Sequence, residues 1–565
     1  MSKNNKKQHI IQLLLAIAII FLVNYIAGYL YFRIDLTTDK RYTISEPSKK
    51  VIKELTDIVY IEIYLDGDMP IAFQRMRKSI LELMDEFRVI AGDNIKYSFI
   101  NPSKSSDQSK RNAIYQELYD RGLTPTNVKD RDREGGIAEK ILFPGAIVSF
   151  QGNEVPLNLL INNPGFSAEV NLNNSIQGLE YSFIDAIRKI TATERKRIAF
   201  IEGQGELDEY QTGDITRELS GYYDIDRVTI NEFVTILDPY DAIIIAGPTD
   251  SYSEKSKFII DQYLMRGGKI LWFIDEVKVD IDSLSAGSTT FALYNDANID
   301  DQLFKYGVRI NPTIIQDMQC AIIPVNTAIS GAQPKFAPAP WIYNPLLGAS
   351  SNHPVTRNLN MIKSEFPSVI DTVGQNPDIK KEFILFSSQN SRVLNVPALI
   401  SLEQVKDKID PASFNRPYQP VAVVLDGVFE SVFKNRIITE YTAGQPFNYL
   451  EKSISTKMIV VSDADIIRNE VRTRADGIFL SPLGYDRYSK QTYGNKDLVM
   501  NMVHYLVDEE GIINIRSREI TLRLLDKNKT LNQRLKWQLI NTLLPLLLII
   551  IFGFAWNYLR RKKYS

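Results

Sequence analysis

Two long segments without charged residues, one near each end of the chain, constrain its architecture most strongly. Residues 10–32 and residues 537–559 contain no Asp, Glu, Lys or Arg. Both exceed the length of about 20 residues that a helix needs to cross the hydrocarbon core of a bilayer. A cleaved signal peptide is the alternative for the first segment, but its apolar stretch continues to Phe32 without a convincing small-residue cleavage site. The sequence therefore predicts two terminal transmembrane helices.

Basic residues beside these segments predict their orientation. Three lysines lie in the tail 1–9, and the tail 560–565 begins Arg-Arg-Lys-Lys. Basic residues in short tails stay cytoplasmic, so we expect two spans in a bacterial inner membrane, both termini in the cytoplasm and residues 33–536 in the periplasm. A second basic set lies in the juxtamembrane amphipathic segment 511–536, but long segments cross the membrane largely regardless of charge. We expect that segment to lie near the headgroups of the lipid bilayer.

The charged and reactive residues exclude several classes of function. The 66 basic and 68 acidic residues leave a net charge of −2, whereas nucleic-acid binding needs a clustered basic surface. One cysteine, Cys320, allows no intramolecular disulfide, CxxC redox pair or thiolate zinc cluster. We expect the three histidines, His9, His353 and His504, to be structural or exposed. The sequence has no GxxxxGK[ST] motif, so we expect no nucleotide hydrolysis through a P-loop in this chain. Because one cysteine and three histidines leave little for metal binding, we also expect no metal, and we expect no cofactor.

The first α/β domain is predicted within residues 33–192. Alternation in "IVYIEIYL" predicts a strand, "FQRMRKSILELMDEFRVIAG" has the period of a helix, and "NIKYSFINPS" is typical of a second strand. A helix is expected over residues 107–121, followed by a hairpin that turns at Gln151, Gly152 and Asn153. This order resembles a thioredoxin-like fold. The redox chemistry of that fold needs CxxC at the start of the first helix, where this chain has "DGDMPIAF", so the resemblance implies the shape without the activity.

A second α/β domain, with insertions, is predicted over residues 193–510. The strands "RIAFIEG", "YDAIIIAGP" and "KILWFID" alternate with helical segments, which is typical of a parallel sheet with crossover helices. This pattern resembles the class I glutamine amidotransferase-like (flavodoxin-like) fold. Glutaminases of that family place a cysteine on a tight turn after a strand, whereas Cys320 lies well beyond the last of these strands. The resemblance therefore implies the fold without a catalytic residue.

The carboxyl ends of these strands provide the remaining candidates for a binding site. Open α/β sheets bind ligands at this edge. The alternative is that the glycines and the proline make tight turns while the acids cap helices. The candidate ligand-binding residues are Glu202, Gly203, Gln204, Gly205, Glu206, Gly247, Pro248 and Asp275.

Several segments in fixed order carry a resemblance to a transporter family. They include "RIDLTTDKRYTISEPSKKVIKEL", "IDDQLFKYGVRINPTIIQD", "QPVAVVLDGVFESVFKNR" and "KMIVVSDADIIRNE". With two terminal spans and paired α/β domains, they resemble the GldG family, the gliding-motility-associated auxiliary subunits of ABC transporters in Bacteroidetes. Related proteins often have His where this chain has Gln204. The resemblance implies a GldF-like permease and a GldA-like cytoplasmic ATPase as partners.

Two predicted membrane anchors favour one class of function over two others. A chain held at both ends cannot shuttle a ligand as a released binding protein does. We therefore expect a non-catalytic periplasmic subunit that couples a cytoplasmic ATPase, through a permease, to transport or mechanical work. The alternatives are a periplasmic envelope enzyme of amidotransferase-like or hydrolase type, and a static envelope-binding protein. Hydrogen-bond contact between Cys320 and His353 or His504 at the sheet edge would favour the enzyme.

Overall fold

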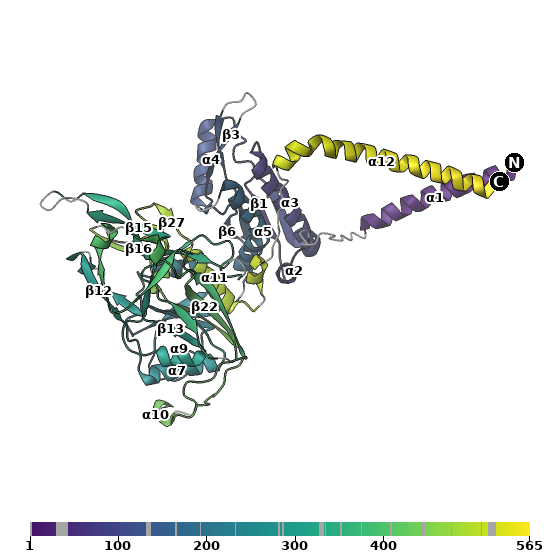
Figure 1. Ribbon diagram of the computed structural model, residues 1–565. Helices are drawn as coiled ribbons and strands as arrows, with labels where there is room; N and C mark the ends of the chain where they lie inside the picture. Colours follow the sequence, from purple (N-terminus) through teal and green to yellow (C-terminus); the bar gives the residue numbers. More distant parts are fainter. Residues whose placement is uncertain are drawn as a thin grey trace. The chain divides into compact units, whose positions relative to one another are not determined.

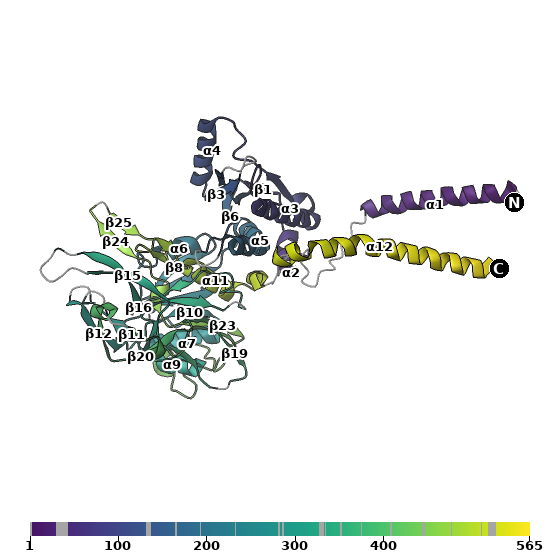
Figure 2. The ribbon, with the colours of Figure 1, turned by 45° about the horizontal axis from the view of Figure 1, so that its top comes forward.

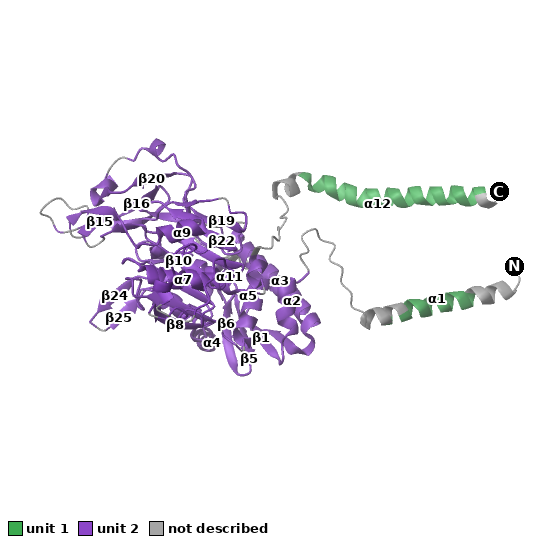
Figure 3. Ribbon diagram, turned by 90° about the horizontal axis from the view of Figure 1, so that it is seen from below, with its two compact units in different colours: residues 1–41, 519–565 green, residues 42–518 purple. Residues whose placement is uncertain are grey.

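Two compact units make up the chain, whose structure is a computed structural model. One comprises residues 1–41 and 519–565, and the other residues 42–518 (Figure 3). The larger unit contains all of the described β-strands. The described residues are 3–29, 43–517 and 527–564, apart from 132–136, 164–166, 193, 232, 281–282, 285–286, 327–332, 334, 351–352, 375, 407–408, 443–446, 476 and 510.

The smaller unit contains the two terminal helices. They are α1 (Lys3–Tyr29) and α12 (Lys527–Tyr564), the second with Pro545 inside it. Within Gln533–Lys562 of α12, the most apolar 18-residue window has a mean hydropathy of 2.3, and none of that window is buried, unlike in a core helix. Among the described residues this is the one helix long and apolar enough to cross a membrane. Its length and composition agree with the predicted span 537–559.

The first predicted span ends outside the described residues. Residues 30–32 belong to a part of the chain that the structure does not describe. The described apolar stretch of α1, Ile10–Leu22, is shorter than a membrane span. The first span therefore stays a prediction.

A four-stranded mixed sheet forms the amino-terminal part of the larger unit. Its strands have the order β2-β1-β5-β6, with β1 parallel to β2 and the other pairs antiparallel. Side chains alternate between the faces of a strand, so Val59, Ile61 and Ile63 are buried under helices while Tyr60 is 50% exposed. The bounds are β1 Val59–Ile63, β2 Ile95–Phe99, β5 Gly145–Phe150 and β6 Asn153–Asn158, and the covering helices are α2 Glu46–Lys53, α3 Ile71–Ala91 and α5 Ala168–Thr191.

The order of elements predicted from residue 58 onward is confirmed, with one addition, and helix α2 before it was not predicted. α3 connects β1 to β2, and α4 (Gln108–Asp120) follows β2. The β5–β6 hairpin turns at Gln151 (φ 48°) and Gly152 (φ 85°), and the short hairpin turns that match strand twist have positive φ at such positions. A second hairpin, β3 (Thr126–Arg131) with β4 (Ile137–Leu142), was not predicted, because β3 is largely polar and gives no apolar alternation.

A ten-stranded sheet forms the core of the rest of the unit. Its main path is β15-β16-β19-β22-β23-β10-β9-β7-β8, and β17 pairs with β16. The strands β10, β9, β7 and β8 are parallel, as predicted. The parallel strand β23 and the antiparallel strands β22, β19, β16 and β15 extend this sheet and were not predicted. The bounds are β7 Arg197–Glu202, β8 Asp224–Thr229, β9 Ala242–Ala246, β10 Lys269–Phe273, β15 Cys320–Asn326, β16 Phe336–Ala349, β17 Ile362–Lys363, β19 Ile379–Phe386, β22 Pro420–Gly427 and β23 Thr456–Val461.

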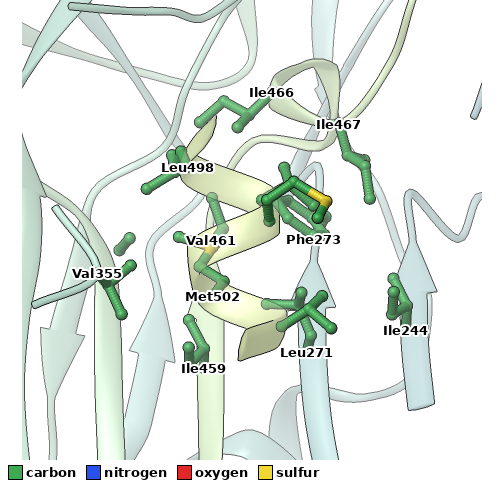
Figure 4. Close-up of a cluster of buried hydrophobic side chains, with 14 of the residues drawn as sticks. Ile244, Leu271, Phe273, Val355, Ile459, Val461, Ile466, Ile467, Leu498 and Met502 are labelled. Carbon is green, nitrogen blue, oxygen red and sulfur yellow. The ribbon is translucent and has the colours of Figure 1, made fainter. Parts of the chain in front are cut away.

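Helices cover both faces of the parallel strands. α6 (Gly213–Leu219) and α11 (Asn495–Val507) pack on one face, and α7 (Glu254–Met265) and α9 (Asp300–Tyr306) on the other (Figure 1, Figure 2). Because neighbouring residues of a strand face opposite sides, each strand supplies both cores and reads as a continuous apolar run. The core under α11 includes Leu271, Phe273, Ile459, Val461, Leu498 and Met502 (Figure 4).

Several small sheets lie outside the ten-stranded sheet. They are a three-stranded sheet, β11-β12-β21, and four two-stranded sheets. The remaining bounds are β11 Val277–Val279, β12 Thr289–Tyr294, β13 Val308–Ile310, β14 Thr313–Asp317, β18 Ile370–Thr372, β20 Ser391–Asn395, β21 Ala398–Ser401, β24 Val471–Arg474, β25 Gly477–Leu480, β26 Tyr485–Asp486, β27 Gln491–Thr492 and α10 Thr439–Thr442.

Candidate functional site

Three loops meet at the carboxyl edge of the parallel strands. β7, β9 and β10 end at Glu202, Ala246 and Phe273, and because the strands are parallel, the loops that follow lie on the same edge. Backbone hydrogen bonds join these loops, from Leu207 N to Ala246 O (2.9 Å) and from Gly247 N to Phe273 O (2.8 Å). The candidate residues therefore lie along one edge of the sheet.

Glu202, at the end of β7, is paired with an arginine. Arg227 donates through Nε to Glu202 Oε1, through Nη1 to Thr212 Oγ1 (3.0 Å) and through Nη2 to Leu207 O (2.8 Å). The planar guanidinium fork suits such a multiple contact. The arrangement ties the loop after β7 to β8 and favours a structural role for Glu202.

The loop from Gly203 to Glu206 is a tight turn. Gly205 has a φ of +73°, and a Cβ atom on it would lie 2.1 Å from Thr249 Oγ1. The carbonyl oxygen of Gln204 accepts hydrogen bonds from Thr249 N (3.0 Å) and Asp250 N (2.9 Å). Gly203 also has a positive φ, +114°. These contacts support the alternative in which the glycines serve the turn.

Glu206 closes this turn with both carboxylate oxygens. Oε2 accepts a hydrogen bond from Gln204 N (2.6 Å), and Oε1 accepts one from the Tyr252 hydroxyl (2.5 Å). Burial, together with the charge and hydrogen bond of Glu206, raises the pKa of Tyr252 well above its usual value of 10. In the turn, the Gln204 amide oxygen is the buried side-chain atom without a hydrogen-bond partner. Both carboxylate oxygens of Glu206 therefore bind groups of the protein itself.

Asn295 holds the other two loops together. Its Nδ2 donates to Asp275 O (2.8 Å) and to Pro248 O (3.0 Å). The Asp275 carboxylate accepts a hydrogen bond from Ala464 N (2.7 Å), in the loop after β23. Gly247 has a φ of +64°, and a Cβ there would lie 3.0 Å from Ala464 Cβ. The loops after β9, β10 and β23 thus pack directly on one another.

Acidic residues that were not predicted lie beside Asp275. Asp463 and Asp465 come shortly after β23, as Asp275 comes shortly after β10. An acidic residue after an apolar strand is therefore the sequence signal by which they could have been found. Asp463 accepts hydrogen bonds from Glu365 N (3.0 Å) and Asp465 N (2.8 Å). Arg468 Nη1 donates to Asp465 Oδ1 (3.2 Å). We call this group the edge cluster: Asp275, Glu365, Asp463, Asp465 and Arg468.

The three aspartates of the edge cluster have raised pKa values. Burial raises the pKa of Asp275 to about 6, and burial followed by the charges of Glu365 and Asp275 raises that of Asp465 to about 8. The pKa of Asp463 is also raised well above its usual range, first by burial and then by its acidic neighbours. Arg468 alone does not balance these carboxyls. At neutral pH some carboxyls of the cluster therefore remain protonated. Catalytic acids show such raised pKa values, and buried carboxyls with a structural role show them as well.

Neither a metal centre nor a cysteine–histidine pair is found in the described part of the chain. Its His, Cys, Asp and Glu side chains form no group of three or more that could hold a metal ion. Burial raises the pKa of Cys320 to about 11, so the thiol is protonated at neutral pH. His353 Nδ1 accepts a hydrogen bond from Val355 N (3.2 Å), and His504 Nδ1 lies 2.7 Å from the Tyr223 hydroxyl. These hydrogen bonds of His353 and His504 do not involve Cys320, whose contact with either histidine would have favoured an enzyme.

Two family models match this chain. One, described as an ABC-type uncharacterized transport system, matches residues 195–502, and a second, described as a domain of unknown function, matches residues 38–149. An uncharacterized protein of Borreliella burgdorferi is 21% identical over 579 residues, covering 99% of each chain. Among solved structures, the mmIFT52 N-terminal domain matches at 12% identity over 55% of this chain and 98% of that chain. Its TM-score of 0.31 supports no argument about the fold.

Proposed function

Because this chain belongs to the family of ABC-type uncharacterized transport systems, matched over residues 195–502, we propose that it is a membrane-anchored periplasmic auxiliary subunit of an ABC transporter. The family match is the observation that carries this proposal. Membership implies an ABC permease and an ATPase as partners. α12 offers a helix long and apolar enough to meet a permease within the bilayer.

A non-catalytic role is part of the same proposal. Glu202 and Glu206 are bound by Arg227 and Tyr252, and the Cys320 thiol is protonated at neutral pH. An activated nucleophile needs an adjacent base or a lowered pKa. These contacts support a chain that transmits or organises work performed by the ATPase.

The membrane arrangement is also proposed. We infer spans at residues 10–32 and 537–559, with both termini in the cytoplasm and the larger unit in the periplasm. The basic tails support this orientation. A periplasm-dependent reporter inserted at Gly152 and a cytoplasm-dependent reporter fused after Ser565 should both be active. The opposite pattern at either site would contradict the orientation.

The finer proposal is a GldG-type subunit linked to gliding motility, acting with a GldF-like permease and a GldA-like ATPase. The order of the sequence motifs supports it. We further propose a thioredoxin-like domain over residues 33–192 and an amidotransferase-like domain over residues 193–510. The β1-α3-β2 unit with the β5–β6 hairpin supports the first, and the parallel strands β7 to β10 support the second.

Purification of the tagged full chain from detergent, followed by mass spectrometry, tests the proposed function. We expect an ABC permease and its ATPase to be enriched with the native chain. In a matched variant, residues 533–562 are replaced by an unrelated apolar helix of equal length. If α12 packs on the permease, this exchange should remove both partners while circular dichroism shows the larger unit folded. Failure of the native chain to recover either partner would contradict the proposal.

A further inference from the structure

A cavity of about 600 Å³ lies beside the carboxyl edge of β10, within the larger unit. Residues from α9, β12 and β13 line it, together with Glu276, which directly follows Asp275. Its volume falls in the range of roughly 300–1,000 Å³ that is typical of small-molecule sites. The cavity is therefore large enough for an organic ligand.

Glu276 is the buried acid of this cavity. It is 3% exposed, and its backbone oxygen accepts a hydrogen bond from Asn295 N (3.0 Å), which fixes its position. In the described part of the structure, no group donates a hydrogen bond to its carboxyl, whereas the neighbouring Asp275 carboxylate binds Ala464 N. Burying a polar group without a partner costs free energy. A ligand in the cavity would supply that partner.

The charges around Glu276 select the sign of the ligand. Asp300 and Asp301 also line the cavity, and Arg309 is the cation among the lining residues. Asp301 is already paired with Lys257, at 2.7 Å, and with Arg436, at 3.6 Å. Asp300 accepts a hydrogen bond from the Tyr294 hydroxyl (2.6 Å). Two carboxyl groups, Glu276 and Asp300, therefore remain against the Arg309 guanidinium, and once Glu276 is ionised this balance favours a cationic ligand over an anionic one.

The rest of the wall selects an apolar ligand body. Phe304 is 57% exposed at the surface of α9, whereas Val308 and Ile310 of β13 are buried below it. An exposed phenylalanine beside buried aliphatic residues offers an apolar contact to a bound molecule. We propose that this cavity binds a small organic amine, whose ammonium group pairs with the Glu276 carboxylate and whose apolar body lies against Phe304.

The titration of Glu276 gives this site a pH signature. Burial, followed by the charge of Asp300, raises its pKa to about 8; Asp296 adds to this and Arg309 opposes it. At pH 7 the carboxyl is mostly protonated, so binding an ammonium group releases a proton. The affinity should therefore rise about tenfold between pH 7 and pH 9, in proportion to the ionised fraction. An alkylamine stays protonated over this range, since its pKa is about 10.

Calorimetry on the full chain in detergent tests the proposal with n-pentylamine, 1-pentanol and pentanoate as probes. Pentylamine should bind at least tenfold more tightly than the other two at pH 9. Comparison of two buffers with different ionisation enthalpies should show nearly one proton released per amine at pH 7. Glu276→Gln should remove both the proton release and the pH dependence. The matched control Glu82→Gln, on the exposed side of α3, should leave both unchanged.

Two outcomes would overturn the proposal. The first is equal binding of pentylamine and 1-pentanol to the native chain at pH 9. The second is unchanged proton release in a folded Glu276→Gln chain. Should Glu276→Gln fail to fold, Arg309→Met provides the same test, because Arg309 is exposed and holds the pKa of Glu276 down. Arg309→Met should move the pH profile of binding to higher pH, and an unmoved profile would contradict the site.

Discussion

Two partly buried ionic clusters of the larger unit balance their charges in opposite ways. The edge cluster holds four carboxyls and one arginine, and its aspartates have raised pKa values. The second cluster lies where α5 meets α11 and is balanced: burial alone would raise the pKa of its one aspartate, but neighbouring charges and hydrogen bonds lower it below the usual value. We call this second group the junction cluster: Asp185, Arg188, Tyr222, Tyr223 and His504.

Hydrogen bonds explain the balance of the junction cluster. Asp185 accepts from Arg188 Nη2 (3.0 Å) and from the Tyr222 hydroxyl (2.7 Å). Arg188 Nη2 also lies 3.3 Å from His504 Nδ1. A guanidinium can only donate, so this nitrogen accepts and the ring is neutral. Burial accordingly lowers the pKa of His504 to about 4, which leaves Arg188 as the cation that stabilises Asp185 at neutral pH.

The two clusters therefore respond to pH with opposite signs. Between pH 4 and 6.5 the unfolded chain binds a proton at His504 that the folded chain does not, so the free energy of unfolding falls as pH falls. At Asp275 and Asp465 the folded chain binds the extra protons, so the free energy of unfolding falls as pH rises from about 4 to about 8. Partial burial is common to both clusters. The charges of the neighbouring groups decide whether the free energy of unfolding falls with rising or with falling pH.

Removing the cation of the junction cluster should have the largest effect. Arg188→Met leaves the Asp185 carboxylate buried without a cation, and we expect a loss of about 3 kcal/mol in the free energy of unfolding. Urea unfolding of the full chain in detergent, followed by circular dichroism at pH 7, measures it. The matched control Arg195→Met removes an exposed arginine and should change stability by less than about 0.5 kcal/mol. Equal losses in both variants would show that the junction cluster contributes no special stability.

The long-range nature of the junction cluster explains why it could not be predicted. Arg188 and His504 are 316 positions apart, and no local periodicity indicates such a partner. The strands β7, β9 and β10 were predictable because each is a continuous apolar run bounded by turn residues. The antiparallel strands β22 and β19 were missed because the sheet joins β10 to β23 across a long insertion.

The edge cluster could be predicted only in part, because contacts between distant parts of the sequence also bring its residues together. Asp275 was found because an Asp after an apolar strand marks the carboxyl edge of a sheet. Asp463 and Asp465 carry the same signal, but only the pairing of β10 with β23 brings them beside Asp275. The burial of Glu276 likewise depends on α9 and β13, which come later in the chain.

Neutralising the edge cluster should stabilise the protein in alkaline solution. Asp465→Asn removes a carboxyl that must be ionised above its pKa of about 8 while it is buried among acids. We expect a gain of about 2 kcal/mol at pH 8.5, and little change at pH 4, where the native carboxyl is already protonated. The same urea titration at the two pH values measures it. Asp120→Asn, on exposed α4, is the control, and a gain of equal size there would remove the distinction.

Replacing the neutral histidine should flatten the acid side of the stability profile. His504→Gln keeps an acceptor for Arg188 but cannot bind a proton in the unfolded state. We expect a loss of about 1 kcal/mol at pH 7 from altered packing. Between pH 6.5 and pH 4 the variant should then lose less stability than the native chain. Parallel profiles for the two chains would mean that His504 is charged in the folded state.

The smallest effect on the free energy of unfolding is expected at Cys320. This residue tests whether a buried group affects stability only at pH values near its pKa. Burial raises its pKa from 9 to about 11, so the folded chain binds an extra proton only between these two values, where stability falls as pH rises. Below pH 8 the thiol is neutral in both states, and Cys320→Ser should give a stability profile from pH 4 to pH 8 that superimposes on the native one within about 0.5 kcal/mol. Recovery of the permease and ATPase should also be unchanged. A Cys320→Ser chain that folds normally yet loses its partners would assign the thiol a role that its protonation does not explain.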